Sequence, residues 1–281
     1  MSTTASKSAG PEAGAGLASE GAGSAERWGP LWGARADDWA RSEEQQLPAY
    51  EETIGRVGLE PGQRVLDVGC GTGVFLRLAA ERGAEPWGID ASTELLELAR
   101  IRVPEADLRR GDMQFLPYDD DGFDLVTGFT SFFFAADLVE ALREAGRVGK
   151  PGAPVVIQVW GRPERCDLEA MKQVTRPFMP GPSSDAPAPP PIWQPGVLEA
   201  IATRAGLSPS FAFDFSYAYE YPDDEALGRL LVAPAGIATL VGPEREEAVR
   251  AQIVEALAPH RTPEGGYRLN NEFRFLVATA P

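Results

Sequence analysis

The chain has 281 residues, is 43% apolar and carries a formal net charge of -16 at pH 7. A chain of this size can bury a sizeable core as one large domain or as one domain with an appended cap, and its acidity would repel nucleic acid. Two cysteines and one histidine are too few for a disulfide framework or a Cys/His zinc site, so we expect a cytosolic protein without a metal.

The N-terminal part begins with residues rich in Ala, Gly and Ser. Residues 1–26 lack the apolar segment of a signal peptide, and no apolar run long enough to span a membrane follows anywhere. We therefore expect a disordered tail over 1–26 and no membrane segment. Residues 37–57 predict a helix that is interrupted near Pro48 and ends before Gly58.

Strands and helices alternate through the next hundred residues. Short apolar runs predict strands, and amphipathic stretches between them predict helices that end at glycines or turns. The predicted strands cover 64–69, 85–90, 106–112, 123–129 and 153–160, and the predicted helices cover 74–83, 92–103 and 138–148. This alternation requires right-handed crossovers, so we expect an α/β fold with a doubly wound, Rossmann-like and mainly parallel sheet.

The character of the chain changes after Trp160. Eight prolines lie between Pro177 and Pro195 and predict a stiff, extended loop. A helix is expected over 196–206, a strand over 210–221, an amphipathic helix over 244–260 and a last strand over 274–280. We accordingly divide the chain into a core with an N-terminal helix (27–160), a proline-rich loop that returns to the sheet (161–222), a helical cap insertion (223–265) and a last core strand (266–281).

A glycine-rich turn follows the first predicted strand. The pattern there is Asp67, Gly69, Gly71 and Gly73, and a turn of this kind lets backbone N–H groups approach a ligand closely. The dinucleotide fingerprint needs a third glycine at the position that Val74 occupies, so a nicotinamide site is disfavoured.

Two acidic residues follow later strands at the same edge of the sheet. Asp90 lies nineteen residues beyond Gly71, at the end of the second predicted strand, where it can accept hydrogen bonds from both ribose hydroxyls. Asp112 ends the third strand and could accept from an adenine amino group, while Met113 packs against the ring. Together these residues predict a nucleoside site.

With these motifs in the order VLDVGCGTG, GID, GDMQFLPYDDDGFDLVTGFTSFFF and EAGRVGKPGAPVVI, the sequence resembles the class I S-adenosylmethionine-dependent methyltransferases, in particular the ubiquinone/menaquinone biosynthesis branch. The resemblance covers about residues 40–160. It implies a seven-stranded sheet with an antiparallel last strand and S-adenosyl-L-methionine as cofactor. The residues that it implies at the cofactor are Asp67, Gly69, Gly71, Gly73, Asp90, Ala91, Asp112, Met113, Phe129 and Thr130.

The chain departs from many relatives after the fourth strand, where SFFFAAD stands in place of histidines. The aromatic residues there fit a core position or a substrate wall equally. Methyl transfer needs alignment and exclusion of water more than a catalytic residue, and only some acceptors need a base. His260 is a weak candidate for that base, and Asp137 and Glu272 are weaker ones.

The acceptor has to be recognised by a lid over the carboxyl ends of the strands. The candidate lid residues are Trp32, Trp39, Phe133, Phe178 and Trp193. Simple packing of the N-terminal helix on the core is the alternative for the tryptophans. A largely apolar lid favours a small, fairly hydrophobic acceptor methylated at oxygen, nitrogen or carbon. A non-catalytic cofactor-binding protein and a protein methyltransferase remain open; the oligomeric state is not predicted.

Overall fold

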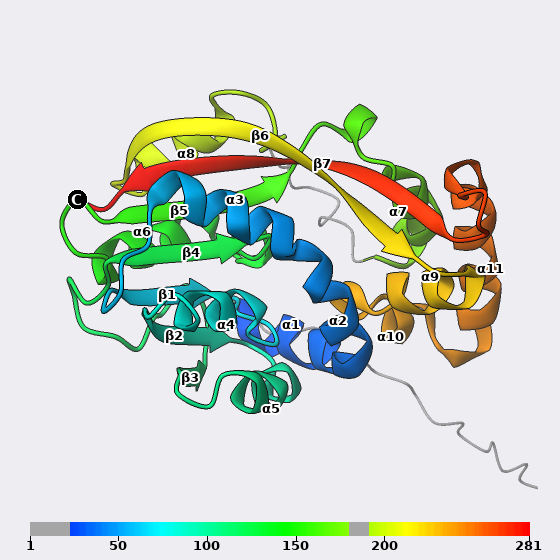
Figure 1. The fold of residues 1–281 in the computed structure, drawn as a ribbon, viewed down its shortest axis with the longest axis horizontal. Coiled ribbons are helices and arrows are strands. Elements are labelled where there is room, and N and C mark those ends of the chain that lie inside the picture. The colour runs from blue at the N-terminus through cyan, green and yellow to red at the C-terminus, as the bar shows by residue number, and fades with distance from the viewer. Residues whose placement is uncertain (1–22, 180–190) are drawn as a thin grey trace, which may run out of the picture.

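The computed structural model describes residues 23–179 and 191–281, and its centre is one seven-stranded sheet (Figure 1). The strand order is β3-β2-β1-β4-β5-β7-β6. Strands β1 to β5 pair in parallel, whereas β7 is antiparallel to both β5 and β6. The predicted doubly wound sheet with an antiparallel last strand is confirmed. The strands are β1 Arg64–Val68, β2 Glu85–Asp90, β3 Asp107–Arg110, β4 Leu125–Phe129, β5 Pro154–Trp160, β6 Ser208–Tyr221 and β7 Tyr267–Thr279.

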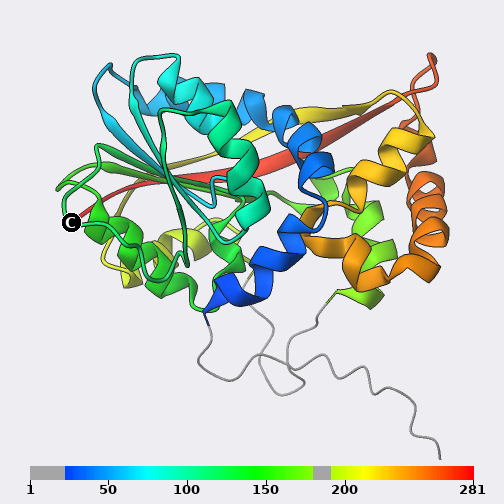
Figure 2. The same ribbon diagram turned by 90° about the horizontal axis from the view of Figure 1, so that it is seen from below.

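Helices cover both faces of this sheet (Figure 2). Alternate residues of a strand point to opposite faces, so Val65 packs with the cluster under one helical layer and Leu66 with the cluster under the other. This burial on both sides explains why the central strands are apolar runs. One layer contains α3 Leu47–Val57, α4 Val74–Ala80 and α5 Thr93–Arg102, and the other contains α6 Leu138–Val148 and α8 Val197–Arg204.

A helical cap lies beyond the carboxyl ends of the parallel strands (Figure 1). Strands β6 and β7 are 14 and 13 residues long, and they run past the core to carry it. The cap helices are α7 Glu169–Thr175, α9 Asp224–Leu231, α10 Ile237–Val241 and α11 Pro243–Leu257. Helix α7 lies within the stretch 161–222 that we assigned to the proline-rich loop, and residues 180–190 of that stretch lie outside the described residues.

The N-terminal segment forms more structure than the sequence suggested. Helix α1 spans Ser24–Gly33 and so begins inside the predicted tail, while residues 1–22 lie outside the described part. Helix α2 spans Ala36–Glu43, and a 3-10 turn separates it from α3. The predicted interruption near Pro48 is present, since α3 begins at Leu47 and ends before Gly58; Pro48 lies in the first turn of α3, where the missing N–H needs no partner. The 3-10 turns are η1 Glu44–Gln46, η2 Phe132–Phe134, η3 Pro163–Arg165, η4 Arg176–Phe178, η5 Pro234–Gly236 and η6 Ala258–His260.

Candidate functional site

The glycine turn joins β1 to α4 and is held against the neighbouring strand. The N–H groups of Gly69 and Cys70 donate to the carbonyl of Ile89, at 2.8 and 3.1 Å. Gly69 has a φ of 79°, and a Cβ built there would lie 2.4 Å from Cβ of Ser131. A side chain at this position is therefore excluded by both backbone conformation and space.

Two buried carboxyl groups lie beside this turn. Asp67 is 3% exposed, and Oδ1 accepts a hydrogen bond from the Thr127 hydroxyl at 2.8 Å. Burial raises the pKa of Asp67 to about 8 and that of Glu43 to about 7. Ionisation of these buried carboxyl groups costs free energy unless a cation lies close by. The site therefore favours a ligand with a positively charged group.

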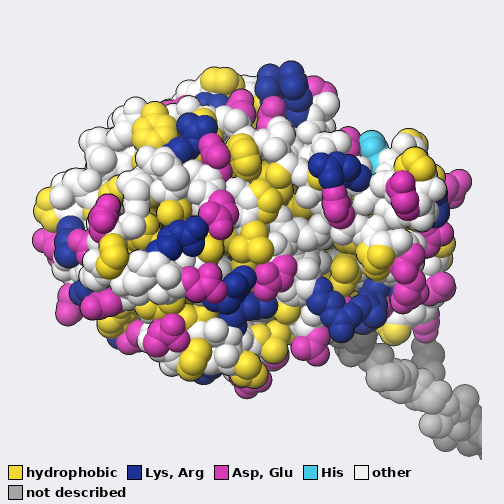
Figure 3. All heavy atoms as spheres, viewed as in Figure 1, with side chains coloured by type: hydrophobic (Ala, Val, Ile, Leu, Met, Phe, Trp, Pro, Cys, Tyr) yellow, Lys and Arg dark blue, Asp and Glu magenta, His cyan; other side chains and the backbone are white. Residues whose placement is uncertain are grey.

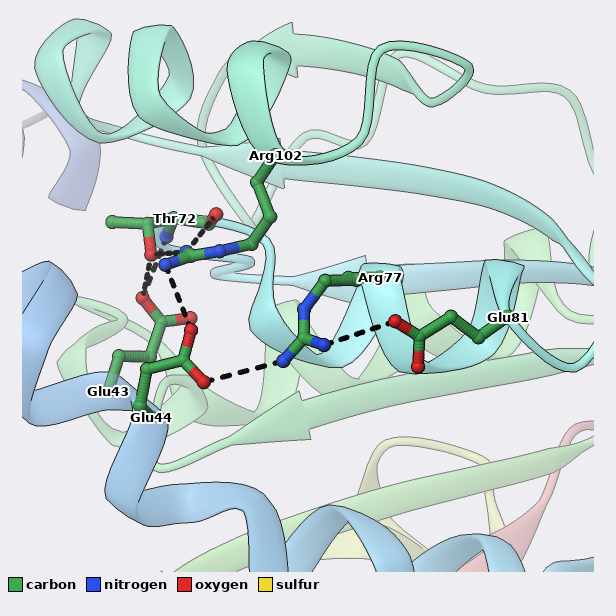
Figure 4. A network of polar contacts seen from close by, with 6 residues as sticks. All are labelled: Glu43, Glu44, Thr72, Arg77, Glu81 and Arg102. Carbon is green, nitrogen blue, oxygen red and sulfur yellow. Dashed lines mark hydrogen bonds and ion pairs between the residues drawn. The ribbon is translucent and has the colours of Figure 1, made fainter.

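Glu43 comes from the end of α2 and ties the N-terminal segment to the turn (Figure 4). Its Oε2 accepts from the N–H of Thr72 at 2.8 Å and from the Thr72 hydroxyl at 2.7 Å. The Arg102 guanidinium donates to the Thr72 carbonyl and hydroxyl oxygens, and pairs with Glu44 at 3.1 Å. Arg77 joins Glu44 to Glu81. The network connects α2, η1, α4 and α5 around the turn.

Asp90 links the glycine turn to the loop after β2. Its Oδ2 accepts from the N–H of Gly71 at 2.9 Å, and Oδ1 accepts from the N–H of Ser92 at 2.8 Å. A carboxylate has about four acceptor positions, so lone pairs remain for further donors. Burial raises the pKa of Asp90, while these backbone donors lower it.

Asp112 is bound by the start of α1. The N–H of Ala25 donates to Oδ2 at 2.7 Å, and the Ser24 hydroxyl lies 3.1 Å from both carboxylate oxygens. The Asp112 carboxylate thus accepts hydrogen bonds from donors at the N-terminus of α1 that have no partner within the helix. Its negative charge also interacts favourably with the helix dipole. An adenine amino group would have to share Asp112 with α1.

Helix α1 lies close against the loop that follows β2. A Cβ at Gly29 would lie 2.4 Å from the carbonyl oxygen of Ala91, and a Cβ at Gly33 would lie 2.1 Å from a Glu94 carboxylate oxygen. Glycine at both positions therefore permits the close approach of α1. The helix covers the part of the site where Asp90 and Asp112 lie.

A cavity of about 80 Å³ lies between the sheet edge and the N-terminal helices; we call it the cofactor chamber. All predicted cofactor residues except Gly73 line it. Its lining is Ser24, Ala25, Trp28, Trp32, Trp39, Glu43, Gln46, Tyr50, Asp67, Gly69, Gly71, Ile89, Asp90, Ala91, Leu95, Gly111, Asp112, Met113, Phe129, Thr130, Ser131 and Phe134. Gly73 instead caps α4, and its Cα faces Ala99.

A second and larger cavity, the acceptor chamber, adjoins the first and holds about 480 Å³. Its wall combines N-terminal, core and cap residues, and most of them are apolar or aromatic. The lining is Trp32, Trp39, Ser42, Gln46, Thr130, Phe133, Phe134, Trp160, Leu168, Glu169, Met171, Lys172, Gln173, Thr175, Arg176, Met179, Tyr219, Tyr221, Leu230, Leu231, Pro234, Ala235 and Ile237. The chamber has the shape and polarity of a small-molecule site.

The residues of the cofactor chamber fit S-adenosylmethionine in their chemistry. Glu43 and Asp67 are buried acids that a cation would stabilise, which matches the ammonium and sulfonium groups. Asp90 retains acceptor positions for ribose hydroxyls. The present volume is below the roughly 150 Å³ of a cavity that holds benzene, so the chamber has to widen when a nucleoside binds.

Several predicted site residues lie elsewhere. Trp32, Trp39 and Phe133 line the acceptor chamber, but Phe178 and Trp193 line neither cavity. The Phe178 ring lies under Arg245 of the cap. His260 pairs with Asp167, 3.3 Å from Nδ1 to the carboxylate, and also lines neither cavity.

The two weaker base candidates have structural partners. Asp137 caps α6 by accepting from the N–H groups of Val139 and Glu140. Glu272 accepts from Arg162, which lowers the pKa of Glu272. Neither lines the cofactor chamber or the acceptor chamber, so the structure does not bring these candidates to the site.

Sequence reasoning missed Glu43 and Gln46, two residues of the SEEQQ segment that line the cofactor chamber. Acidic and amide residues on a predicted helix normally face water, and nothing local marks these two as buried. The one usable signal is that SEEQQ interrupts an amphipathic helix with several polar residues in succession.

The outer surface mixes charges of both signs. On the face drawn in Figure 3, Lys and Arg side chains are interspersed with Asp and Glu side chains. Within residues 23–179 and 191–281, no helix is both long and apolar enough to cross a membrane.

Residues 66–157 match the family model described as a methyltransferase domain. An uncharacterised protein of Mycobacterium tuberculosis is 32% identical over 169 residues, which cover 58% of this chain and 60% of that protein. The demethylmenaquinone methyltransferase of Renibacterium salmoninarum is 36% identical over 110 residues, 39% of this chain and 46% of that enzyme. The chain thus spans about half the length of these curated relatives.

Among solved structures, the complex of the Haloferax volcanii Trm112 methyltransferase activator with a methyltransferase matches with a TM-score of 0.58 and 23% identity, covering 89% of this chain and 96% of that one. The [4+2]-cyclase SpnF matches with a TM-score of 0.55 and 22% identity, covering 83% and 81%. These structures share the fold. That a cyclase is among them shows that activity has to be argued from the chambers themselves.

Proposed function

We propose that this chain methylates a small, largely apolar molecule. The chain belongs to the class I S-adenosylmethionine-dependent methyltransferases and takes S-adenosyl-L-methionine as its cofactor. The observation that carries the proposal is the adjoining pair of chambers, one with buried carboxylates and one with an aromatic wall. A site for two ligands side by side is what group transfer needs and what simple cofactor binding does not.

The cofactor supplies a methyl group on an already positive sulfur, so the protein's main tasks are alignment and exclusion of water. We assign Asp90 to the ribose, the glycine turn with Asp67 to the methionine part, and Asp112 with Met113 to the adenine. Glu43 and Asp67 offset positive charge, and the Glu43 contact with Thr72 holds α2 on the turn. Trp28 and Trp32 of α1 keep water out.

The acceptor is assigned to the larger chamber. Trp160, Tyr219 and Tyr221 supply flat surfaces for an apolar or aromatic body, which suits a small molecule better than an extended peptide. A relative named as a demethylmenaquinone methyltransferase supports a small acceptor, without identifying it.

The experiment has two steps. Calorimetric titration with S-adenosylhomocysteine and S-adenosylmethionine, with NAD as control, should give micromolar binding of the sulfur nucleosides alone. The protein is then incubated with methyl-deuterated S-adenosylmethionine and a small-molecule extract, and products heavier by the labelled methyl group are sought by mass spectrometry. Binding without any labelled product would favour a non-catalytic binding protein, and absence of binding would refute the proposal.

A further inference from the structure

The two chambers meet at a neck formed by the residues that line both of them: Trp32, Trp39, Gln46, Thr130 and Phe134. A methyl group that passes from one chamber to the other has to pass here. Three neck residues are aromatic. The polar side-chain groups of the neck are the Gln46 carboxamide, the Thr130 hydroxyl and the indole N–H donors of Trp32 and Trp39, and of these Gln46 has the group that a neighbouring residue orients.

Gln46 is 4% exposed, and its carboxamide is oriented by a buried chain of hydrogen bonds. The Tyr217 hydroxyl donates to Oε1 of Gln46 at 2.8 Å, and itself accepts from Nε2 of Gln158 at 3.5 Å. With Oε1 occupied in this way, the NH₂ group is the part of Gln46 left for the neck. No residue in the described part of the chain accepts a hydrogen bond from it. A donor without a protein partner beside the aromatic residues of the neck is stabilised by a ligand that accepts.

Thr130 is the second polar group of the neck and has a strained backbone. Its φ is 49°, a conformation that is rare for a β-branched residue and recurs at functional sites. The Thr130 N–H donates to the carbonyl of Gln158 at 3.2 Å. Gln158 of β5 thus orients both polar residues of the neck, through its backbone and through Tyr217.

The acceptor chamber has no suitable base. Its titratable lining residues in the described ranges are Glu169, Lys172, Arg176, Tyr219 and Tyr221. Burial raises the pKa of both tyrosines, and Glu169 pairs with Lys172 at 3.1 Å. Among the described residues of this chamber, the one carboxylate that could remove a proton from the reacting atom of an acceptor is thus the paired Glu169.

The titratable groups of the two chambers differ in kind. Glu43, Asp67, Asp90 and Asp112 line the cofactor chamber, whereas two cations and one acid line the acceptor chamber. The overall charge of -16 opposes an anion at a distance, but salt screens that effect beyond about 8 Å. Local groups therefore dominate inside the chamber.

We propose that the acceptor is an apolar molecule whose reacting group is an oxyanion, a carboxylate or an acidic enol or phenol in its ionised form, and that the Gln46 amide selects it. The inference rests on the proposed function. The oxyanion supplies the electron pair of the new O–C bond, the C–S bond breaks with its pair left on sulfur, and no proton is transferred. Gln46 donates to the oxyanion and holds it at the neck.

The test uses three matched pairs of probes, with a phenyl, a naphthyl or a decyl body. In each pair, one probe carries a carboxylate and the other carries an aminomethyl group in its place. Each is titrated calorimetrically into the full chain saturated with S-adenosylhomocysteine. In at least one pair, the carboxylate should bind the wild type at least about tenfold more tightly than the amine. Q46E keeps an oxygen for Tyr217 but replaces the donor by an acceptor, so it should weaken the carboxylate by about tenfold to a hundredfold and strengthen the amine.

Q46L should weaken the carboxylate without strengthening the amine, and Q46E still decides the question if Q46L fails to fold. The matched control is Gln252→Leu, at an exposed position of α11 that lines neither chamber; it should leave all affinities unchanged. If no carboxylate binds more tightly than its amine, or if Q46E leaves the preference unaltered, the inference is wrong. If S-adenosylhomocysteine itself fails to bind the wild type, the proposed function has failed instead.

Discussion

Replacing Gly29 by alanine tests whether α1 is part of the cofactor site. Gly29 is buried in α1, and a Cβ there would lie 2.4 Å from the oxygen and 3.0 Å from the carbon of the Ala91 carbonyl. Both are backbone atoms, so α1 itself has to shift. Gly55 of α3 offers the matched control, because it is an exposed helical glycine with no atom within 4 Å of the added Cβ.

The expected magnitudes follow from two opposing effects. Alanine in a helix interior is favoured over glycine by about 0.5–1 kcal/mol. This gain applies to G55A, whereas at Gly29 the following Pro30 disfavours the helical conformation of a residue with a Cβ. Overpacking costs about 1–3 kcal/mol and applies to G29A alone. G55A should therefore be slightly stabilised. In G29A, docking of α1 should weaken by about 1–3 kcal/mol, which corresponds to a loss of about fivefold to a hundredfold in affinity for S-adenosylhomocysteine.

The assay is calorimetric titration of both variants with S-adenosylhomocysteine, together with urea unfolding. The folded state of G29A is checked by its unfolding midpoint, so that loss of affinity is not mistaken for loss of structure. Equal affinities of G29A and G55A would refute the reasoning, because they would show that α1 does not need its close contact with Ala91 for the cofactor to bind.

Three further predictions follow. Asp90→Ala should weaken S-adenosylhomocysteine binding by about 1.5–3 kcal/mol, as charged hydrogen bonds are lost; an unchanged affinity in calorimetry, with the variant folded, would contradict the ribose assignment. Burial raises the pKa of Glu43 from 4.5 to about 7 and that of Asp67 from 3.8 to about 8, so the folded chain holds protons that the unfolded chain releases. The free energy of unfolding should accordingly fall between pH 4 and pH 8. Glu43 contributes on the order of 3 kcal/mol of stability that is present below pH 4.5 and lost by pH 7. E43Q should flatten that part of the curve in urea unfolding, and a curve as steep as the wild type's would be inconsistent with a buried, proton-holding Glu43. His260→Ala should leave methyl transfer within about twofold of the wild type, because His260 faces Asp167 outside both chambers; a large fall in labelled product would restore it as a base candidate.

The core could be predicted from the sequence because its signals are local. The run around Leu66 and the glycines that follow it specify a buried strand, a tight turn and a helix, whatever the rest of the chain does. Asp90 and Asp112 could be placed because parallel strands bring their carboxyl ends to one edge of the sheet. All three features depend on residues close together in sequence.

The rest of the site depends on contacts between distant segments. The burial of Gln46 could not be predicted from its neighbours in the sequence, because its hydrogen-bond donor, the Tyr217 hydroxyl, lies 171 residues away. Phe178 and Trp193 of the proline-rich stretch were predicted to be lid residues, yet neither lines a chamber. Aromatic residues in a loop are equally suited to packing, so the sequence does not distinguish the two roles. An N-terminal helix was expected, but the bounds of α1 were not, because Gly29, Pro30 and Gly33 have low helix propensity, which the packing of α1 on Ala91 overrides.

The two chambers are built from different parts of the chain, which has a consequence for how new acceptor specificities could arise. Apart from the N-terminal segment up to Gln46 and Tyr50, the cofactor chamber is built from residues 67–134, whereas the far wall of the acceptor chamber comes from residues beyond Trp160. Because that wall comes from the segment after β5 and from the insertion between the long strands β6 and β7, the cap can change in sequence without altering the glycine turn. Grafting a foreign cap onto these strands should therefore yield a chimera that keeps its donor and accepts a different molecule, provided that Trp32, Trp39 and Gln46 still meet the new surface.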